Sequence, residues 1–223
     1  PGESFIKIGV GHLLKSGKGP YRFHKSYKIQ KAGDWTVEKT KDSISFTQEL
    51  KDDRGWGYLY TKTVKLTGEP AGLVLERTLK NIGAKAIETN FYNHNMIIID
   101  GRKIGPEYRF VSAADLTIPD NLKAKWAKLG ATIGAHEITF DKTVSGALWA
   151  KVEGREGKIF KDVKVINKDA GVGVQLSCSA PLSKFNIYIE KTALCPEPFH
   201  RFNIEPGKEV KWSSSYTFFE TKK

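Results

Sequence analysis

The strongest constraint on the fold is the spacing of apolar residues, which alternate with polar residues in short runs that end at Gly, Pro, Asn or Asp. Side chains of a β-strand point alternately to its two faces, so this period of two predicts half-buried strands. Ile44 and Phe46 alternate with polar neighbours in this way. Comparable strand-like runs cover residues 57–66, 73–79, 86–100, 158–166 and 185–189. We therefore expect more than ten strands.

One segment departs from this pattern. Leu122, Trp126 and Leu129 stand at i, i+4 and i+7, which predicts a helix of about two turns over residues 121–129. So many strands with short connections otherwise predict an all-β fold, a large antiparallel β-sandwich. No internal repeat, low-complexity linker or shift in composition marks a boundary, so we expect residues 1–223 to form a single domain.

Length and composition are those of a folded chain. The 223 residues are 39% hydrophobic and 27% charged, which is enough apolar material for a sizeable core and excludes a disordered chain. No apolar run is long enough to span a bilayer, so no membrane span is expected. Because the sequence begins with Pro1, we expect it to lack N-terminal residues of a longer gene product. A removed leader would place the protein outside the cytoplasm, and the compartment stays open.

The formal net charge of +11 invites a nucleic-acid interpretation. Most of the basic residues are lysines that are spread singly along the chain and interleaved with acids, and only seven are arginines. A lysine-rich solvated surface explains this distribution, and no nucleic-acid partner is expected. The charge leaves an anionic ligand open, and the sequence does not indicate the oligomeric state.

Motifs exclude several classes of chemistry. Cys178 and Cys195 are too few for a disulfide framework, and we expect two buried thiols. The five histidines form no HxH or HExxH pattern, so no metal site is expected. The chain has no G-x-S-x-G, P-loop or Rossmann glycine pattern, which removes the support for acyl transfer, nucleotide hydrolysis and hydride transfer. No cofactor is expected.

An unusual polar cluster, Asn93, His94 and Asn95, interrupts a strand-like run directly before the apolar residues 96–99. One interpretation is structural: the two asparagines satisfy backbone groups where the strand is distorted, and His94 is a hydrogen-bonded histidine. The other interpretation is a functional site. The residues alone leave both open.

A second unusual feature is Glu197, which stands between Pro196 and Pro198. Proline stiffens the backbone and removes a ladder donor. We therefore expect Glu197 in a rigid, irregular connection that aims its carboxylate. The alternative is an ordinary solvated glutamate in a loop.

These two segments carry a resemblance. Residues 89–95, Thr-Asn-Phe-Tyr-Asn-His-Asn, followed by Asp100-Gly101, resemble the T-N-H-x-Y-F-N-L-x-G segment of the aldose 1-epimerases, the galactose mutarotase family. Downstream, residues 194–199, the Pro-Gly-Lys-Glu turn at 206–209 and the aromatic run at 216–218 are similar to the closing pattern of that family. The resemblance covers most of residues 5–219 and implies the supersandwich form of the β-sandwich.

The resemblance also implies catalytic functions. In the family, the motif histidine protonates the ring oxygen of the sugar and the late glutamate removes the proton of the anomeric hydroxyl, which here correspond to His94 and Glu197. A second histidine assists in the family, and His24 is the best-placed candidate, with His12 behind it. We expect the substrate to contact polar and aromatic residues near these positions, namely Asn93, Asn95, Tyr92, Trp56, Arg201 and His12.

Tryptophans receive two different assignments. Trp56 lies between Gly55 and Gly57, which indicates a turn that could present its ring to a sugar. The other four tryptophans are expected in the core. These are Trp35, Trp126, Trp149 and Trp212.

Three functions stay open for this chain, all with a sugar or oligosaccharide as the ligand. The first is a cofactor-independent isomerase that interconverts sugar anomers. The second is a non-catalytic carbohydrate-binding module, which the absence of the family's N-terminal Asn-Arg pair favours. The third is a lyase acting on an acidic polysaccharide, with His94 or Tyr92 as the base, which the net charge of +11 favours.

Overall fold

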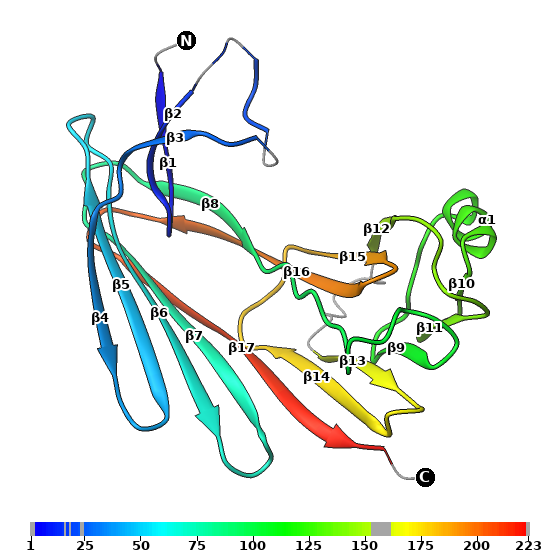
Figure 1. The fold of residues 1–223 in the computed structure, drawn as a ribbon. Coiled ribbons are helices and arrows are strands. Elements are labelled where there is room, and N and C mark those ends of the chain that lie inside the picture. Colours follow the sequence, from blue (N-terminus) through cyan, green and yellow to red (C-terminus); the bar gives the residue numbers. More distant parts are fainter. Residues whose placement is uncertain (1–2, 16, 18, 23–24, 153–161, 222–223) are drawn as a thin grey trace. The chain divides into compact units, whose positions relative to one another are not determined.

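The computed structural model describes residues 3–15, 17, 19–22, 25–152 and 162–221, and Figure 1 shows its elements. Contacts divide the chain into two compact units. Unit 1 comprises residues 1–65, 76–88 and 203–211, and unit 2 comprises residues 66–75, 89–202 and 212–223. The single-domain organisation stays a prediction, because the same strands contribute to both units.

Unit 1 is built from antiparallel strands. β1 to β3 form a small sheet, and a second sheet has the order β7-β6-β5-β4 within this unit. The register of the hairpin of β5 and β6 pairs Ser43 with Lys65 and Lys51 with Gly57. The strands of these two sheets are β1 (Ser4–Lys7), β2 (Gly11–Leu14), β3 (Lys28–Lys31), β4 (Asp34–Lys39), β5 (Ser43–Lys51), β6 (Gly57–Thr67) and β7 (Gly72–Asn81).

The described residues of unit 2 form two sets of strands and one helix. One set has the order β10-β11-β9-β13-β14-β17, and the other has the order β12-β15-β16-β8. The elements are β8 (Ile87–Tyr92), β9 (Tyr108–Ser112), α1 (Asp120–Lys128), β10 (Ala131–Ile133), β11 (Glu137–Phe140), β12 (Leu148–Val152), β13 (Asp162–Asn167), β14 (Val172–Cys178), β15 (Lys184–Glu190), β16 (Ala193–Ile204) and β17 (Glu209–Glu220). The predicted all-β fold of more than ten antiparallel strands is confirmed.

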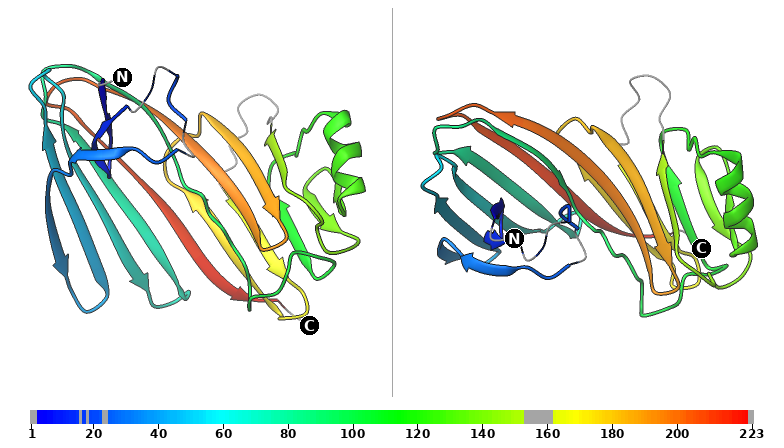
Figure 2. Two further views of the ribbon diagram at one scale, coloured as in Figure 1. Left: turned by 45° about the horizontal axis from the view of Figure 1, so that its top comes forward. Right: turned by 90° about the horizontal axis from the view of Figure 1, so that it is seen from above.

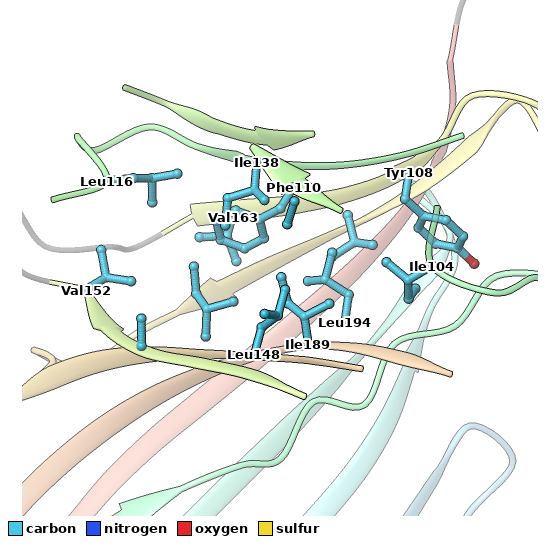
Figure 3. Packing of buried hydrophobic residues seen from close by; sticks show 14 of the residues in the cluster. Ile104, Tyr108, Phe110, Leu116, Ile138, Leu148, Val152, Val163, Ile189 and Leu194 are labelled. Atoms are coloured by element: carbon cyan, nitrogen blue, oxygen red, sulfur yellow. The ribbon is translucent and has the colours of Figure 1, made fainter. Parts of the chain in front are cut away.

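The core of unit 2 lies between its two sets of strands (Figure 3). Phe110 and Val163 point from β9 and β13 toward Leu148 and Ile189 of β12 and β15, and none of the four is more than 2% exposed. Burying one such side chain stabilises a fold by about 1.5–3 kcal/mol. This layered packing gives unit 2 the sandwich that the alternating pattern predicts.

The predicted helix over residues 121–129 is present as α1, which contacts β10 (Figure 2). Trp126 is its buried residue, with 1% of its surface exposed, as the apolar spacing indicates. No helix in the described ranges is long and apolar enough to cross a membrane.

The structure corrects two expectations. The run at 86–100 does not stay a strand, since β8 ends at Tyr92 and the chain turns at Asp100 and Gly101, whose φ angles are 52° and 65°. Trp126 and Trp212 are buried as expected, whereas Trp35 and Trp149 are 44% and 54% exposed. An aromatic residue on a strand is compatible with either face, so composition alone misplaced these two side chains.

Candidate active site

One face of the β12-β15-β16 sheet carries Glu197, a predicted catalytic residue. Cys195 pairs with Tyr188 and Glu197 pairs with Asn186, so these four side chains share a face. The alternate residues of β15, such as Ile187, point to the other face and into the core. Alternation along β15 and β16 therefore separates the hydrophobic core from the polar groups.

Glu197 lies inside the twelve-residue strand β16, so the prediction of an irregular connection was wrong. The backbone groups of Leu194 and Ile97 exchange two hydrogen bonds, N–H to C=O in each direction. The backbone N and C=O groups of residues 194, 196 and 198 therefore face the segment after β8. Glu197 and its neighbours of the same parity are hydrogen-bonded to β15 instead. Pro196 and Pro198 therefore remove backbone N–H donors only on the side of β16 that faces the segment after β8. The hydrogen bonds to β15 on the other side remain and keep these residues in the strand.

The segment around His94 is held by Asn95 where that ladder is broken. The Asn95 side chain is 6% exposed, and its Nδ2 donates to the carbonyl oxygen of Pro196 over 2.7 Å. Its Oδ1 accepts a hydrogen bond from the hydroxyl of Tyr216. Asn95 thus replaces a missing strand contact and fixes its neighbour His94, in agreement with the structural interpretation of this asparagine. Nδ2 of Asn93 instead donates to the hydroxyl of Tyr216 over 3.4 Å. Contact of Asn95 with a substrate stays a prediction.

His94 and Glu197 are in direct contact. Nδ1 of His94 lies 2.7 Å from Oε1 of Glu197, and the histidine side chain is 53% exposed whereas the glutamate side chain is 4% exposed. The other ring nitrogen, Nε2, lies 3.1 Å from the hydroxyl of Tyr92. Asn186 Nδ2 donates to Oε2 of Glu197 over 3.4 Å. A buried carboxylate is therefore paired with an accessible imidazole, an arrangement suited to moving a proton.

Cys195 completes this cluster. Its Sγ lies 3.8 Å from Oε1 of Glu197 and 4.0 Å from Nδ1 of His94, and the residue is fully buried. Burial, and then the adjacent Glu197 carboxylate, raise the pKa of the Cys195 thiol to about 12. Both cysteines are free and buried, as the sequence indicates.

Aromatic and basic side chains lie beside the His94–Glu197 pair. The Tyr92 ring stacks on Phe199 at a centroid distance of 4.1 Å, and Nζ of Lys184 lies 3.9 Å from the centroid of the Phe199 ring. Trp149 is exposed on β12 and pairs with Tyr188, so it shares the face of the cluster. Arg201 is exposed four residues after Glu197 on the same strand.

Two predicted substrate-binding residues lie in unit 1. Nε2 of His12 is 2.8 Å from Nη2 of Arg54, which in turn lies 2.7 Å from Asp52. Burial raises the pKa of Asp52, but the Trp56 backbone N–H and the Arg54 guanidinium together lower it below its usual value. Trp56 stands in the predicted turn, where its backbone N–H donates a hydrogen bond to Oδ1 of Asp52. The structure thus places His12 and Trp56 around one ion pair, and His24 lies outside the described residues.

Comparisons with solved structures identify the fold. The chain is similar to a putative aldose 1-epimerase from Escherichia coli K12, with 13% identity and a TM-score of 0.59 over 98% of this chain and 79% of the other. It is similar to a GalM/aldose epimerase homologue from C. elegans, with 14% identity and a TM-score of 0.57 over 99% and 79%. The chain has the galactose mutarotase-like fold. A galactose 1-epimerase from Lactobacillus acidophilus NCFM shares this fold at 13% identity and a TM-score of 0.53, over 94% and 76%.

No family model and no curated protein sequence matches the chain. Within this galactose mutarotase-like fold, sequence reasoning brought His94 and Glu197 to attention but missed Cys195 and Trp149. Cys195 and His94 are 101 positions apart, so no spacing rule could join them. The signal for Trp149 was its alternation with Leu148 and Ala150, which are both fully buried.

Proposed function

We propose that the chain opens and recloses a sugar hemiacetal without a cofactor, interconverting the α and β anomers. The observation that carries this proposal is the 2.7 Å contact between His94 Nδ1 and Glu197 Oε1, made by a half-exposed imidazole and a buried carboxylate. An acid and a base placed side by side are the groups that the reaction requires. The galactose mutarotase-like fold of aldose 1-epimerases supports a sugar as the substrate.

The two reacting oxygens of a hemiacetal are bonded to one carbon, so they lie close enough together to face this pair from one side. In the opening step, the Glu197 carboxylate takes the proton of the anomeric hydroxyl and a carbonyl forms at the anomeric carbon. The bond from that carbon to the ring oxygen breaks, its electron pair stays on the ring oxygen, and the His94 imidazolium protonates it. The products are an open-chain aldehyde, neutral His94 and protonated Glu197.

Reclosure resets the site. Rotation about the bond next to the aldehyde exposes its other face. Glu197 then returns its proton to the anomeric oxygen, the attacking hydroxyl gives its proton to His94, and both groups regain their starting protonation states. Tyr92, which contacts Nε2, orients the imidazole for both directions.

Site-directed substitution tests this assignment. Glu197→Gln keeps the shape of the side chain but cannot accept the proton, so kcat for anomerisation should fall at least about a hundredfold with little change in sugar affinity. His94→Asn should behave in the same way. Polarimetry and NMR exchange on a panel of neutral, acidic and phosphorylated sugars provide the measurement.

Matched controls come from β11 and the residue before it. His136 and Glu137 form ion pairs with Asp115 and Arg109, so His136→Asn and Glu137→Gln repeat the two substitutions away from the His94–Glu197 pair. Both controls should retain the wild-type rate. Exchange that survives Glu197→Gln at the wild-type rate would remove this carboxylate from the mechanism.

A non-catalytic carbohydrate-binding module is the second candidate, and the exposed side chain of Trp149 favours it. The exposed ring of Trp149 offers a flat apolar surface of the kind on which a sugar can stack. Saturable binding without exchange above the uncatalysed rate, across the whole panel, would favour the module.

A further inference from the structure

The His94–Cys195–Glu197 cluster offers three different metal-ligating atoms at one place. Nδ1, Sγ and Oε1 all lie within 4.8 Å of one another and come from segments about a hundred residues apart. An imidazole nitrogen, a thiolate and a carboxylate oxygen are the three side-chain ligand types of zinc. Acid–base chemistry on a sugar uses only two of them, so the function proposed above does not account for the thiol.

The spacing of the three atoms fits a small cation. The edges of the triangle are 2.7 Å, 3.8 Å and 4.0 Å. A point equidistant from all three atoms lies about 2.1 Å from each, close to the usual zinc bond lengths of about 2.0–2.3 Å. An ion displaced slightly from the plane of the three atoms lies somewhat farther from each of them.

Asn186 provides an independent indication. Its side chain is buried, with 4% of the residue exposed, and its Nδ2 donates to Oε2 of Glu197. Oδ1 of the same amide has no hydrogen-bond partner among the described residues. A buried amide oxygen without a donor, on a residue that hydrogen-bonds one of the three ligating side chains, is suited to accept a hydrogen bond from a water molecule bound to the ion. The hydroxyl of Tyr92, 3.1 Å from Nε2 of His94, orients the imidazole ring so that Nδ1 faces the other two ligand atoms.

We propose that His94, Cys195 and Glu197 form a binding site for a divalent transition metal ion of the zinc type. The mixture of nitrogen, sulfur and oxygen ligands favours Zn²⁺ over Mg²⁺ or Ca²⁺, which prefer oxygen ligands. Metal binding and the proposed anomerisation exclude each other, because both use the same lone pairs on Nδ1 and Oε1. The metal proposal does not rest on turnover.

Cobalt titration of the full chain under reducing conditions tests the site. Co²⁺ bound to Cys195 should give a thiolate-to-cobalt charge-transfer band that saturates at one ion per chain, and Zn²⁺ should abolish the band by displacing Co²⁺. Cys195→Ser should eliminate the band. Cys178→Ser is the matched control, because it removes the other buried thiol and should leave the band intact.

Loss of the other ligands should weaken binding without removing the thiol. His94→Ala and Glu197→Gln should each raise the Co²⁺ dissociation constant at least about tenfold. Circular dichroism of each variant verifies that it is folded. Absence of the band from the wild-type chain at millimolar Co²⁺ overturns the proposal, and so does a band that survives Cys195→Ser. Since no sugar is present, this outcome is independent of any test of anomerisation.

Discussion

Asn95→Ala should destabilise unit 2 more than a surface substitution, because the buried amide holds two groups together. The variant loses the 2.7 Å hydrogen bond from Nδ2 to the Pro196 carbonyl and the acceptor that Oδ1 offers to Tyr216. Each intramolecular hydrogen bond contributes about 1 kcal/mol net, and a buried polar group left unpaired costs about 1–3 kcal/mol. We therefore expect the free energy of unfolding to fall by about 2–4 kcal/mol.

Urea unfolding followed by circular dichroism measures this change, and an unchanged m-value assigns it to the native state. Asn90→Ala is the matched control, because Asn90 is exposed on the neighbouring strand β8, and its free energy of unfolding should stay within about 0.5 kcal/mol of wild type. Asn95→Asp offers a second variant: it keeps an acceptor for Tyr216 but cannot donate to Pro196, so it should also be destabilised. If Asn95→Ala matches the Asn90→Ala control, the amide does not replace the missing ladder contact.

Three further predictions concern stability. Trp126→Ala removes the buried anchor of α1 and should lower the free energy of unfolding by about 3–5 kcal/mol in urea titrations. Gly72→Ala directs a methyl group into the carbonyl oxygen of Tyr216, so its melting temperature should fall, whereas Gly68→Ala, with open space around it, should melt like wild type. Burial raises the pKa of Tyr58 from 10.0 to about 12, so the folded state holds the phenol proton more tightly than the unfolded state. The resulting contribution to the free energy of unfolding is complete below pH 10 and should be lost between pH 10 and pH 12, by at most about 1.4 kcal/mol per pH unit. In Tyr58→Phe the free energy of unfolding should fall less steeply over the same pH range.

Local patterns predicted the elements well because strand and helix periods are local properties. Trp126 identified α1 by its spacing from Leu122, and alternation identified the strands on either side of the core. Exposure of Trp149 was mispredicted because the residue type outweighed the parity of its buried neighbours. Parity along a strand was therefore the better guide to burial.

The site was only partly predictable because its contacts join distant segments. Glu197 and His94 stood out as polar residues in unusual surroundings. Their contact, however, depends on which side of β16 lacks the backbone N–H groups of Pro196 and Pro198, because the segment that carries His94 lies on that side. That side depends on the register between β15 and β16, which the sequence does not show. Cys195 looked like an ordinary buried thiol until this register placed it beside Glu197.

Five strands, β6, β7, β8, β16 and β17, begin in one compact unit and end in the other. Each unit is therefore assembled from three separated stretches of chain, and no single cleavage or truncation releases one of them intact. A chain truncated before residue 203 lacks a segment of unit 1 and should not fold that unit completely, whereas circular permutation at an exposed hairpin turn preserves every strand pair. Ribosomal synthesis adds a temporal consequence, because unit 1 cannot be completed until residues 203–211 have emerged, after nearly all of unit 2.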